Sequence, residues 1–306
     1  MNAYLIWLEW PEKCFRMTAE ALRAFKALVP KGSRVTWARS EAAFLRALPS
    51  ATHAVVWEFK RAWFARAPKL KVLATPAAGR ELVPTEGPKG VKIHFGAFHG
   101  AIISETVLGF VLAWEHGFFR KVPLWPRSNL AEHVGALADT TAVVFGYGRI
   151  GRAIGARLEQ FGVKVHGITR HRPYDLKSQM KHVRSADWLI LALPSDTGTD
   201  NLLDSKLIAK LSKKCVVINI GRGNSIDETA LLTALKAGRI AGAYLDVFKQ
   251  EQTVLQKVSG KTKIKGVDLA TMRNPPENLV RTPHASAFST HYLQMAFEEL
   301  KHEGLI

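Results

Sequence analysis

One strand–loop–helix–strand unit, at residues 141–168, constrains this chain of 306 residues more than any other feature. An apolar run at 141–145 leads into Gly146-Tyr-Gly-Arg-Ile-Gly151, which has the spacing G-x-G-x-x-G. A helical pattern follows until Gly162, and a second apolar run covers 163–168. A strand before the glycines and a helix after them predict a βαβ unit, which requires a parallel sheet with helices packed on it.

The three glycines of this motif have separate predicted roles. Gly146 permits the tight turn after the strand, Gly148 lets a pyrophosphate approach the backbone, and Gly151 lets helix and strand pack closely. Backbone N–H groups at the helix start, aided by the helix dipole, would bind the phosphates. The loop therefore predicts a dinucleotide site, although a glycine-rich turn that binds nothing has the same local pattern. The residues expected in this site are Gly146, Tyr147, Gly148, Arg149, Ile150 and Gly151.

Composition is that of a globular protein. The chain is 47% hydrophobic and 23% charged, and its length suits two domains that each bury a core. The two cysteines, Cys14 and Cys215, argue against a disulfide scaffold. The first ten residues lack the basic region of a signal peptide, and the apolar segment at 107–114 is too short to span a bilayer. We therefore expect a cytoplasmic protein.

The net charge of +17 is unusual and admits three kinds of partner: nucleic acid, an anionic membrane surface or an anionic small molecule. Lys and Arg are spread along the whole chain. The densest cluster, at 257–265, has four lysines but no aromatic residue for base stacking. The charge is therefore interpreted mainly as solvated surface, with a bias toward small anionic substrates. Neither nucleic acid nor a membrane is expected as a partner.

The rest of the chain repeats the alternation of strand and helix patterns. Before the glycine motif, strands are expected at 4–8, 34–37, 54–57, 70–74 and 91–95, and helices at 19–28, 41–48 and 101–119. After it, strands are expected at 186–193, 215–220, 241–247 and 279–281, and helices at 204–211, 228–237 and 289–301. Residues 253–274 show no period and are expected to form an exposed, basic insertion. This order predicts an α/β fold of two Rossmann-like lobes, each a doubly wound parallel sheet, with the second lobe inserted into the first.

Reactive side chains gather just after the predicted strands, where open α/β sheets bind their ligands. They follow six predicted strands and lie in the glycine motif, at 169–172, at 194–197, at 221–223, at 246–251 and at His284. Together, Arg, Asp, Glu and His suit hydride transfer. They supply a cation for a carboxylate and a carbonyl, a histidine as proton donor, and a carboxylate to tune the histidine.

Four of these segments resemble one known family. They are Ala186-Asp-Trp-Leu-Ile-Leu-Ala-Leu-Pro194, Ile218-Asn-Ile-Gly-Arg-Gly223, Ala241-Gly-Ala-Tyr-Leu-Asp-Val-Phe248 with Glu251, and Thr282-Pro-His-Ala-Ser286. They are similar to motifs of the D-isomer-specific 2-hydroxyacid dehydrogenases, and within that family to the glyoxylate/hydroxypyruvate reductases. The resemblance implies a flavodoxin-like substrate domain of residues 1–101 and 286–306, and an NAD(P)-binding Rossmann domain of residues 102–285.

The resemblance also implies a role for each residue of the catalytic centre. His284 protonates the carbonyl oxygen, and Glu251 hydrogen-bonds the imidazole and raises the pKa of His284. Arg222 binds the substrate carboxylate and polarises the carbonyl, for which its planar fork is better suited than a lysine. Asp246 would face the nicotinamide carboxamide. Each also has a structural alternative, as a turn residue, a satisfied histidine or a loop cap, and Gln252 stands where the family usually has proline after the glutamate.

A loop of the first lobe is expected to bind the substrate. Ala78 and Gly79 match the family's loop whose backbone N–H groups hold the substrate carboxylate. Arg80 departs from the family's pattern of a small residue followed by Asp, and it would either add a cation near the substrate or face solvent. Further cofactor contacts are expected at Leu193, Pro194, Thr199, Ile220, Gly221, Asp246 and His284.

The residues after the second strand of the βαβ unit decide the expected cofactor. A site selective for NAD places an acidic residue there to hold the ribose hydroxyls, whereas this chain has Thr169-Arg170-His171-Arg172. No acid repels a 2′-phosphate, and Arg170 and Arg172 can pair with it. NADP is therefore favoured over NAD, by roughly 1.5–3 kcal/mol if one bidentate contact forms. The alternative is that both arginines face water.

Together these expectations describe NADP-dependent reduction of a small 2-keto acid, of the glyoxylate or hydroxypyruvate type, to the D-2-hydroxy acid by a homodimer. No metal is expected, because His94 and His99 lack metal-ligand spacing to other residues. Two alternatives stay open. One is a nicotinamide-sensing, corepressor-like binding protein. The other is an enzyme of the same family that acts on phosphoglycerate or a bulkier keto acid, and Arg80 is the residue that could favour a second anion on the substrate.

Overall fold

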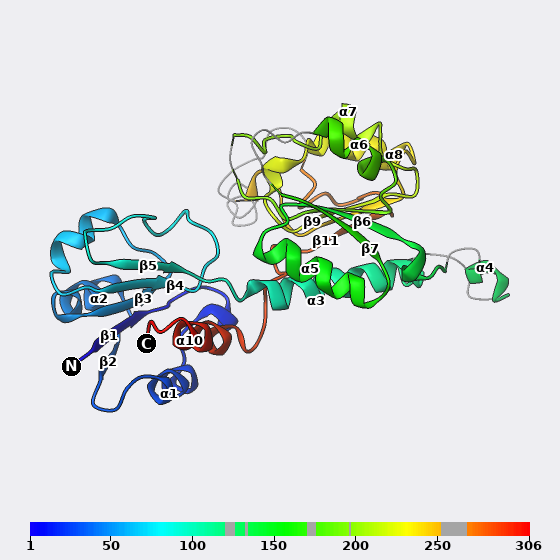
Figure 1. Ribbon diagram of the computed structural model, residues 1–306. Coiled ribbons are helices and arrows are strands. Elements are labelled where there is room, and N and C mark those ends of the chain that lie inside the picture. Colours follow the sequence, from blue (N-terminus) through cyan, green and yellow to red (C-terminus); the bar gives the residue numbers. More distant parts are fainter. Residues whose placement is uncertain (120–125, 132–133, 170–175, 196, 252–267) are drawn as a thin grey trace. The chain divides into compact units, whose positions relative to one another are not determined.

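Two separate parallel sheets organise the computed structural model, which describes residues 1–119, 126–131, 134–169, 176–195, 197–251 and 268–306 (Figure 1). The chain divides into one unit formed by Met1–His99 and Phe288–Ile306 and a second unit formed by Gly100–Ala287. The second unit is thus inserted into the sequence of the first. The boundaries expected from the sequence differ from these by two residues at each crossing.

The first unit contains five parallel strands in the order β2-β1-β3-β4-β5. This is the flavodoxin-like order, in which the sheet reverses its direction of growth beside the first strand. β1, which lies between β2 and β3, is apolar on both faces because helices cover both. The strands are β1 Ala3–Trp7, β2 Arg34–Trp37, β3 His53–Val56, β4 Val72–Thr75 and β5 Lys92–Phe95.

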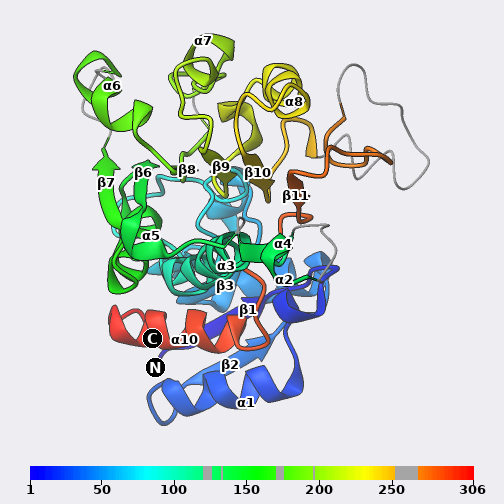
Figure 2. The ribbon, with the colours of Figure 1, turned by 90° about the vertical axis from the view of Figure 1, so that its right-hand side faces the viewer.

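Three α-helices accompany this sheet: α1 Ala19–Leu28, α2 Glu41–Ala47 and α10 Tyr292–His302. α1 and α10 lie side by side (Figures 1 and 2), and Phe25 and Phe297 pack edge to face between them. Side chains of α2 pack with Leu5 in a second cluster, which also includes Trp63 of the 3₁₀ helix Arg61–Arg66. Two shorter 3₁₀ helices span Lys13–Phe15 and Leu48–Ser50.

The second unit contains six parallel strands in the order β11-β10-β9-β8-β6-β7. β6 pairs with both β7 and β8, so the sheet reverses its direction of growth at β6, and α/β sheets bind ligands at such a point. The strands are β6 Thr141–Phe145, β7 Lys164–Ile168, β8 Trp188–Leu191, β9 Val216–Asn219, β10 Gly242–Leu245 and β11 Leu279–Arg281.

Helices cover both faces of this six-stranded sheet (Figure 1). α3 and α5 pack on one face, and α6, α7 and α8 pack on the other. The helices are α3 His99–Glu115, α4 Ser128–Ala131, α5 Arg149–Gln160, α6 Leu176–Arg184, α7 Ser205–Ile208 and α8 Glu228–Lys236, with 3₁₀ helices at Leu137–Asp139 and Gly223–Ser225. The expected α/β fold of two doubly wound parallel sheets is confirmed.

The expected elements are present, with two differences. The helices α4 and α6 and the 3₁₀ turns were not expected. The prediction of an exposed insertion at 253–274 is wrong for its last part, because Leu269 is fully buried and the guanidinium of Arg281 donates to the carbonyls of Leu269, Ala270 and Met272. Residues 252–267 lie outside the described part of the chain. In the ranges given above, no helix has the length and apolar character needed to cross a membrane.

Candidate active site

The glycine loop joins β6 to α5 at the carboxyl edge of the second unit's sheet. Gly146 has φ +84°, and a Cβ there would lie 2.4 Å from the carbonyl oxygen of Ala192 at the end of β8. A Cβ at Gly151 would lie 2.4 Å from the carbonyl oxygen of Gly146. Both positions therefore require glycine, and the expected tight turn and close packing are confirmed.

Gly148 differs from the other two glycines, because a Cβ there would meet nothing within 4 Å. It is the N-cap of α5, and no side chain caps this helix. The first helical hydrogen bond to Gly148 comes from the N–H of Arg152, so the first-turn N–H groups of Arg149, Ile150 and Gly151 precede the helical ladder. The loop thus offers open space and backbone donors together, which fits the phosphates of a dinucleotide.

Tyr147, the second residue of the motif, folds back onto two further glycines. A Cβ at Gly167 on β7 would lie 2.2 Å from the tyrosine ring, and a Cβ at Gly155 on α5 would lie 2.6 Å from its hydroxyl. The N–H groups of Gly146 and Tyr147 both donate to the carbonyl of Ile168, at 3.0 and 3.1 Å. The loop is therefore fixed by the end of β7, and Tyr147 serves as part of its scaffold.

His284 and Glu251 form a pair on the same edge of the sheet. Nδ1 of His284 lies 2.9 Å from Oε2 of Glu251, and Oε1 of that carboxylate accepts from the N–H of Phe248 at 2.9 Å. His284 follows β11 with φ +54°, in the left-handed region that residues other than glycine rarely adopt. The imidazole is half exposed, and Nε2 is the nitrogen left to meet a ligand.

The pair shifts the pKa values of both partners. The hydrogen bond to Glu251, and then the charge of that carboxylate, raise the pKa of His284 above its ordinary value against the opposing effect of burial. Burial alone would raise the pKa of Glu251, but the hydrogen bond and charge of His284 and the N–H of Phe248 lower it overall. Relative to a free histidine, the pair therefore favours the protonated imidazole.

Arg222 lies in the loop that follows β9. Asn219, the last residue of that strand, holds this loop: its Nδ2 donates to the carbonyl of Arg222 and its Oδ1 accepts from the N–H of Gly221, both at 3.1 Å. A Cβ at Gly223 would lie 1.9 Å from the carbonyl carbon of Phe248. The Arg222 loop therefore packs directly on the turn that leads to Glu251.

Two polar residues expected to contact the cofactor have buried side chains. Asp246 has no exposed surface, and its carboxylate accepts hydrogen bonds from Ala285, Ser286 and Thr282 in the loop around His284. Thr199 is equally buried, and its hydroxyl donates to the carbonyl of Pro194 at 2.9 Å. The structure gives both side chains a scaffold role, and their direct contact with a cofactor stays a prediction.

The remaining predicted residues fall into three groups. Leu193, Pro194, Ile220 and Gly221 lie together, since a Cβ at Gly221 would lie 2.5 Å from the N and O atoms of Leu193. Ala78, Gly79 and Arg80 follow β4 in the first unit, where the Arg80 guanidinium lies 5.5 Å from the ring centroid of Phe95. Thr169 is exposed after β7, whereas Arg170, His171 and Arg172 lie outside the described residues.

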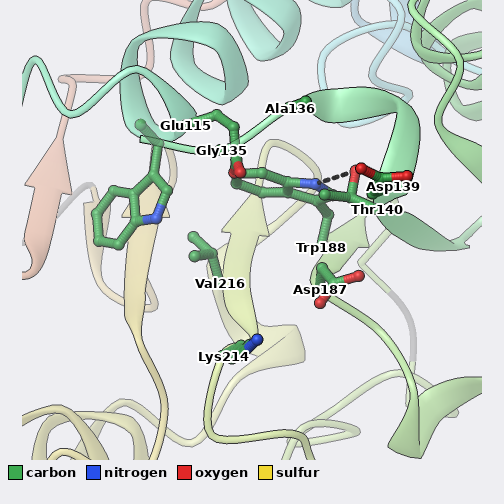
Figure 3. Close-up of a pocket in the computed structure, with 10 residues that line it drawn as sticks. Glu115, Gly135, Ala136, Asp139, Thr140, Asp187, Trp188, Lys214 and Val216 are labelled. Carbon is green, nitrogen blue, oxygen red and sulfur yellow. Dashed lines mark hydrogen bonds between the residues drawn. The ribbon is translucent and has the colours of Figure 1, made fainter. Parts of the chain in front are cut away.

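A cavity of about 310 Å³ lies at the amino-terminal ends of strands in the same sheet (Figure 3). Thr140 and Asp187 line it directly before β6 and β8, and Lys214 lines it two residues before β9, whereas the reactive residues follow the strands. Within the described segments, no group of three or more histidine, cysteine, aspartate or glutamate side chains is placed to hold a metal ion.

Sequence reasoning did not assign Asn219, Thr282 or Ser286. Asn219 had a signal, since it ends an otherwise apolar, fully buried strand, Val-Val-Ile-Asn. Thr282 and Ser286 flank His284 in the quoted motif, but their hydroxyls meet Asp246 from 36 and 40 residues away. Only the fold brings these groups together.

A family model matches this part of the chain. The model for the NAD binding domain of D-isomer specific 2-hydroxyacid dehydrogenase covers residues 120–286, which is more than half of the chain. The matched span contains the glycine loop, Arg222, Glu251 and His284.

Individual proteins are similar over longer stretches. The chain is 27% identical over 212 residues to glyoxylate reductase from Thermococcus gammatolerans. The aligned residues make up 61% of this chain and 63% of that protein. It is 28% identical over 250 residues to glycerate dehydrogenase from Methylorubrum extorquens, covering 76% of this chain and 74% of the relative. The solved structure of an NADPH-dependent glyoxylate/hydroxypyruvate reductase from Sinorhizobium meliloti, in complex with NADP and sulfate, superposes with a TM-score of 0.71. That comparison has 25% identity and covers 100% of this chain and 96% of the other.

Proposed function

The chain belongs to the D-isomer-specific 2-hydroxyacid dehydrogenase family, and from that premise we propose that it reduces a small 2-keto acid to the D-2-hydroxy acid. The proposed substrates are of the glyoxylate or hydroxypyruvate type. The observation that carries the proposal is the His284–Glu251 pair beside the Arg222 loop, on the sheet edge that holds the glycine loop. Relatives named as glyoxylate reductase and glycerate dehydrogenase support the substrate class.

His284 supplies the proton in the proposed reaction. With its pyrophosphate held at the start of α5, a bound reduced nicotinamide would supply the hydride for the carbonyl carbon of the keto acid. The Nε2–H of His284 protonates the carbonyl oxygen, so the C=O double bond becomes a CH–OH group and the imidazole becomes neutral. Because Nδ1 stays hydrogen-bonded to Glu251, the ring keeps its orientation before and after transfer.

Arg222 binds the anionic end of the substrate. Its guanidinium presents a planar fork of donors that matches a carboxylate, and a 2-keto acid places the carbonyl oxygen beside that carboxylate. Asn219 fixes the backbone on which the guanidinium is carried. Ala78, Gly79 and Arg80 belong to the first unit, and their part in substrate binding rests on the resemblance alone.

The proposed cofactor is NADP in preference to NAD. Gly148 and the first turn of α5 fit a pyrophosphate, as described above. Arg170 and Arg172 would pair with the 2′-phosphate, and no acidic residue stands between Thr169 and Arg172 to hold free ribose hydroxyls. The Sinorhizobium meliloti enzyme, solved with NADP, supports this choice.

The proposal is tested by a grid of initial rates. NADPH and NADH are each combined with glyoxylate, hydroxypyruvate, pyruvate, phenylpyruvate and phosphohydroxypyruvate, and nicotinamide absorbance is followed. We expect fastest turnover of a small keto acid with NADPH. In His284→Ala, kcat should fall by about a thousandfold or more, because the proton donor is lost, while the Kd for NADPH changes little.

Each other outcome of the grid has a distinct meaning. A preference for NADH would keep the reaction and remove Arg170 and Arg172 as phosphate ligands. Fastest turnover of phosphohydroxypyruvate or phenylpyruvate would keep the reaction class and change the substrate. Tight dinucleotide binding without turnover of any keto acid would favour a sensing role, and near-normal kcat in His284→Ala would refute the assigned proton donor.

We also propose that the enzyme is a homodimer of the cytoplasm. The dimer rests on the family resemblance and is tested by light scattering of the purified protein. The compartment rests on cysteine usage, since Cys14 and Cys215 are both free and far apart in the chain.

A further inference from the structure

The carboxylate of Asp246 is the centre of a buried hydrogen-bond network around His284. The carbonyl of Asp246 accepts from the N–H of His284 at 2.8 Å. Its carboxylate accepts from the N–H of Ala285 at 2.7 Å and from the N–H of Ser286 at 3.2 and 3.1 Å. One residue thus holds three consecutive N–H groups, beginning at the left-handed His284.

Three hydroxyl groups complete this network. Thr282 donates to Oδ1 of Asp246 at 2.5 Å, and Ser286 donates to Oδ2. The Tyr244 and Thr282 hydroxyl oxygens lie 2.8 Å apart. A hydroxyl has one hydrogen to donate, and Thr282 gives its own to the carboxylate, so Tyr244 must be the donor to Thr282. The direction of every bond in the chain Tyr244–Thr282–Asp246 is therefore set by the buried carboxylate.

The network is anchored on α3 at two neighbouring positions of the same helix face. Thr106 donates from its hydroxyl to the carbonyl of Ser286 at 3.0 Å. Four residues along, Phe110 stacks on the ring of Tyr244, with centroids 4.8 Å apart and planes at 18°. Tyr244 and Ser286 are both buried, so water does not compete for these bonds.

We propose that Tyr244 and Ser286 are positioning residues for the reaction: through Asp246, their hydroxyls hold His284 in the backbone conformation that aims its imidazole at Glu251. This inference rests on the proposed function and concerns two residues whose side chains are buried. The left-handed backbone of His284 is unfavourable by itself and persists only where the surroundings over-determine it. Asp246 provides that restraint, because its carbonyl holds the N–H of His284 and its carboxylate holds the N–H of Ala285. Each hydroxyl donor satisfies part of a carboxylate that has no solvent-exposed surface.

The test removes single hydroxyl groups with Ser286→Ala and Tyr244→Phe. Ser104→Ala and Tyr4→Phe are matched controls, because both remove a buried, hydrogen-bonded hydroxyl away from this network. We expect kcat to fall about tenfold in Ser286→Ala and less in Tyr244→Phe, which acts through Thr282. In both, the alkaline limb of the kcat/KM profile should move to lower pH, with the Kd for NADPH unchanged. Neither control should move that limb.

The double variant adds a second criterion. If both hydroxyls act through Asp246, the loss of kcat in the double variant will be smaller than the product of the two single losses. The proposal is overturned if both single variants keep the wild-type pH limb and a kcat equal to that of their controls. If Ser286→Ala does not fold, Tyr244→Phe alone tests the proposal, since it removes only the hydroxyl group and keeps the aromatic ring.

A readout without turnover separates this proposal from the proposed function. The His284 imidazole is titrated by NMR of histidine-labelled protein and assigned by its absence in His284→Ala. A lowered titration midpoint in Tyr244→Phe and Ser286→Ala supports the positioning role, and an unchanged midpoint refutes it. This result is obtained even if the wild-type protein reduces none of the keto acids, an outcome that would count against the proposed function alone.

Discussion

At the scale of single residues, the candidate site centres on His284, whose pKa is shifted by its neighbours. Glu251 is fixed by the N–H of Phe248, so its second oxygen meets His284 in one orientation. Arg222 opposes this effect, because its positive charge lowers the pKa of His284. The larger effect is that of Glu251, and the pKa of His284 is raised overall.

This balance predicts the pH dependence of Glu251→Gln. The proposed reduction requires the imidazolium form, which persists up to the raised pKa of His284 and is lost as the pH rises through it. Glutamine keeps an oxygen for the N–H of Phe248 but removes the negative charge, so the pKa of His284 falls. The alkaline limb of kcat/KM should move to lower pH, with a loss of about tenfold or more on that limb.

The measurement is kcat/KM for the best keto acid, taken between about pH 5 and about pH 10 in wild type and in Glu251→Gln. Glu159→Gln serves as the control, since Glu159 is an exposed carboxylate at the end of α5. An alkaline limb that stays in place in Glu251→Gln would remove this carboxylate from the tuning of His284.

At the scale of elements, the glycine loop is specified by contacts rather than by glycine content. Gly32 and Gly146 have the same φ of +84°, but a Cβ at Gly32 meets nothing within 4 Å, whereas one at Gly146 lies 2.4 Å from the Ala192 oxygen. The two positions therefore share backbone strain and differ only in the close approach to β8. Comparing substitutions at Gly32 and Gly146 therefore separates the cost of a left-handed backbone from the cost of a steric clash with β8.

Alanine at these two positions should have unequal consequences. Gly32→Ala should lower the free energy of unfolding by about 1–2 kcal/mol, from the left-handed conformation alone. Gly146→Ala should lose more and should also abolish dinucleotide binding, because the loop must move away from β8. Urea unfolding and NADPH titration of both variants provide the measurement. Equal losses in the free energy of unfolding at the two positions would mean that the loop moves away from β8 without an energetic penalty.

The difference between expected and observed elements has a physical cause. Strands such as β2 and β11 have the bounds expected from the sequence, because apolar runs between turn residues depend on local chain properties. The segment around the buried Leu269 shows no hydrophobic periodicity, because a hydrogen bond from Arg281 holds it and no helix or strand is needed. The network on Asp246 was equally inaccessible, because it joins groups 36 to 40 residues apart.

At the scale of the whole molecule, the net charge of +17 raises the question of whether anion binding is local or general. A general field attracts every anion and is screened by salt over about 10 Å at 0.1 M. Local arginines discriminate between ligands that differ by one phosphate. The two cofactors differ in this way, since NADPH carries a 2′-phosphate that NADH lacks.

Salt titrations of cofactor binding therefore separate the two effects. If Arg170 and Arg172 hold the 2′-phosphate, the Kd for NADPH will rise more steeply with salt than the Kd for NADH, between about 20 and about 500 mM. In Arg170→Ala/Arg172→Ala the two slopes should converge. Arg23→Ala/Arg46→Ala removes the same charge from exposed positions of the first unit and should leave the difference intact. Equal slopes in the wild-type protein would mean that the charge of the whole chain, and not these two arginines, attracts the cofactor.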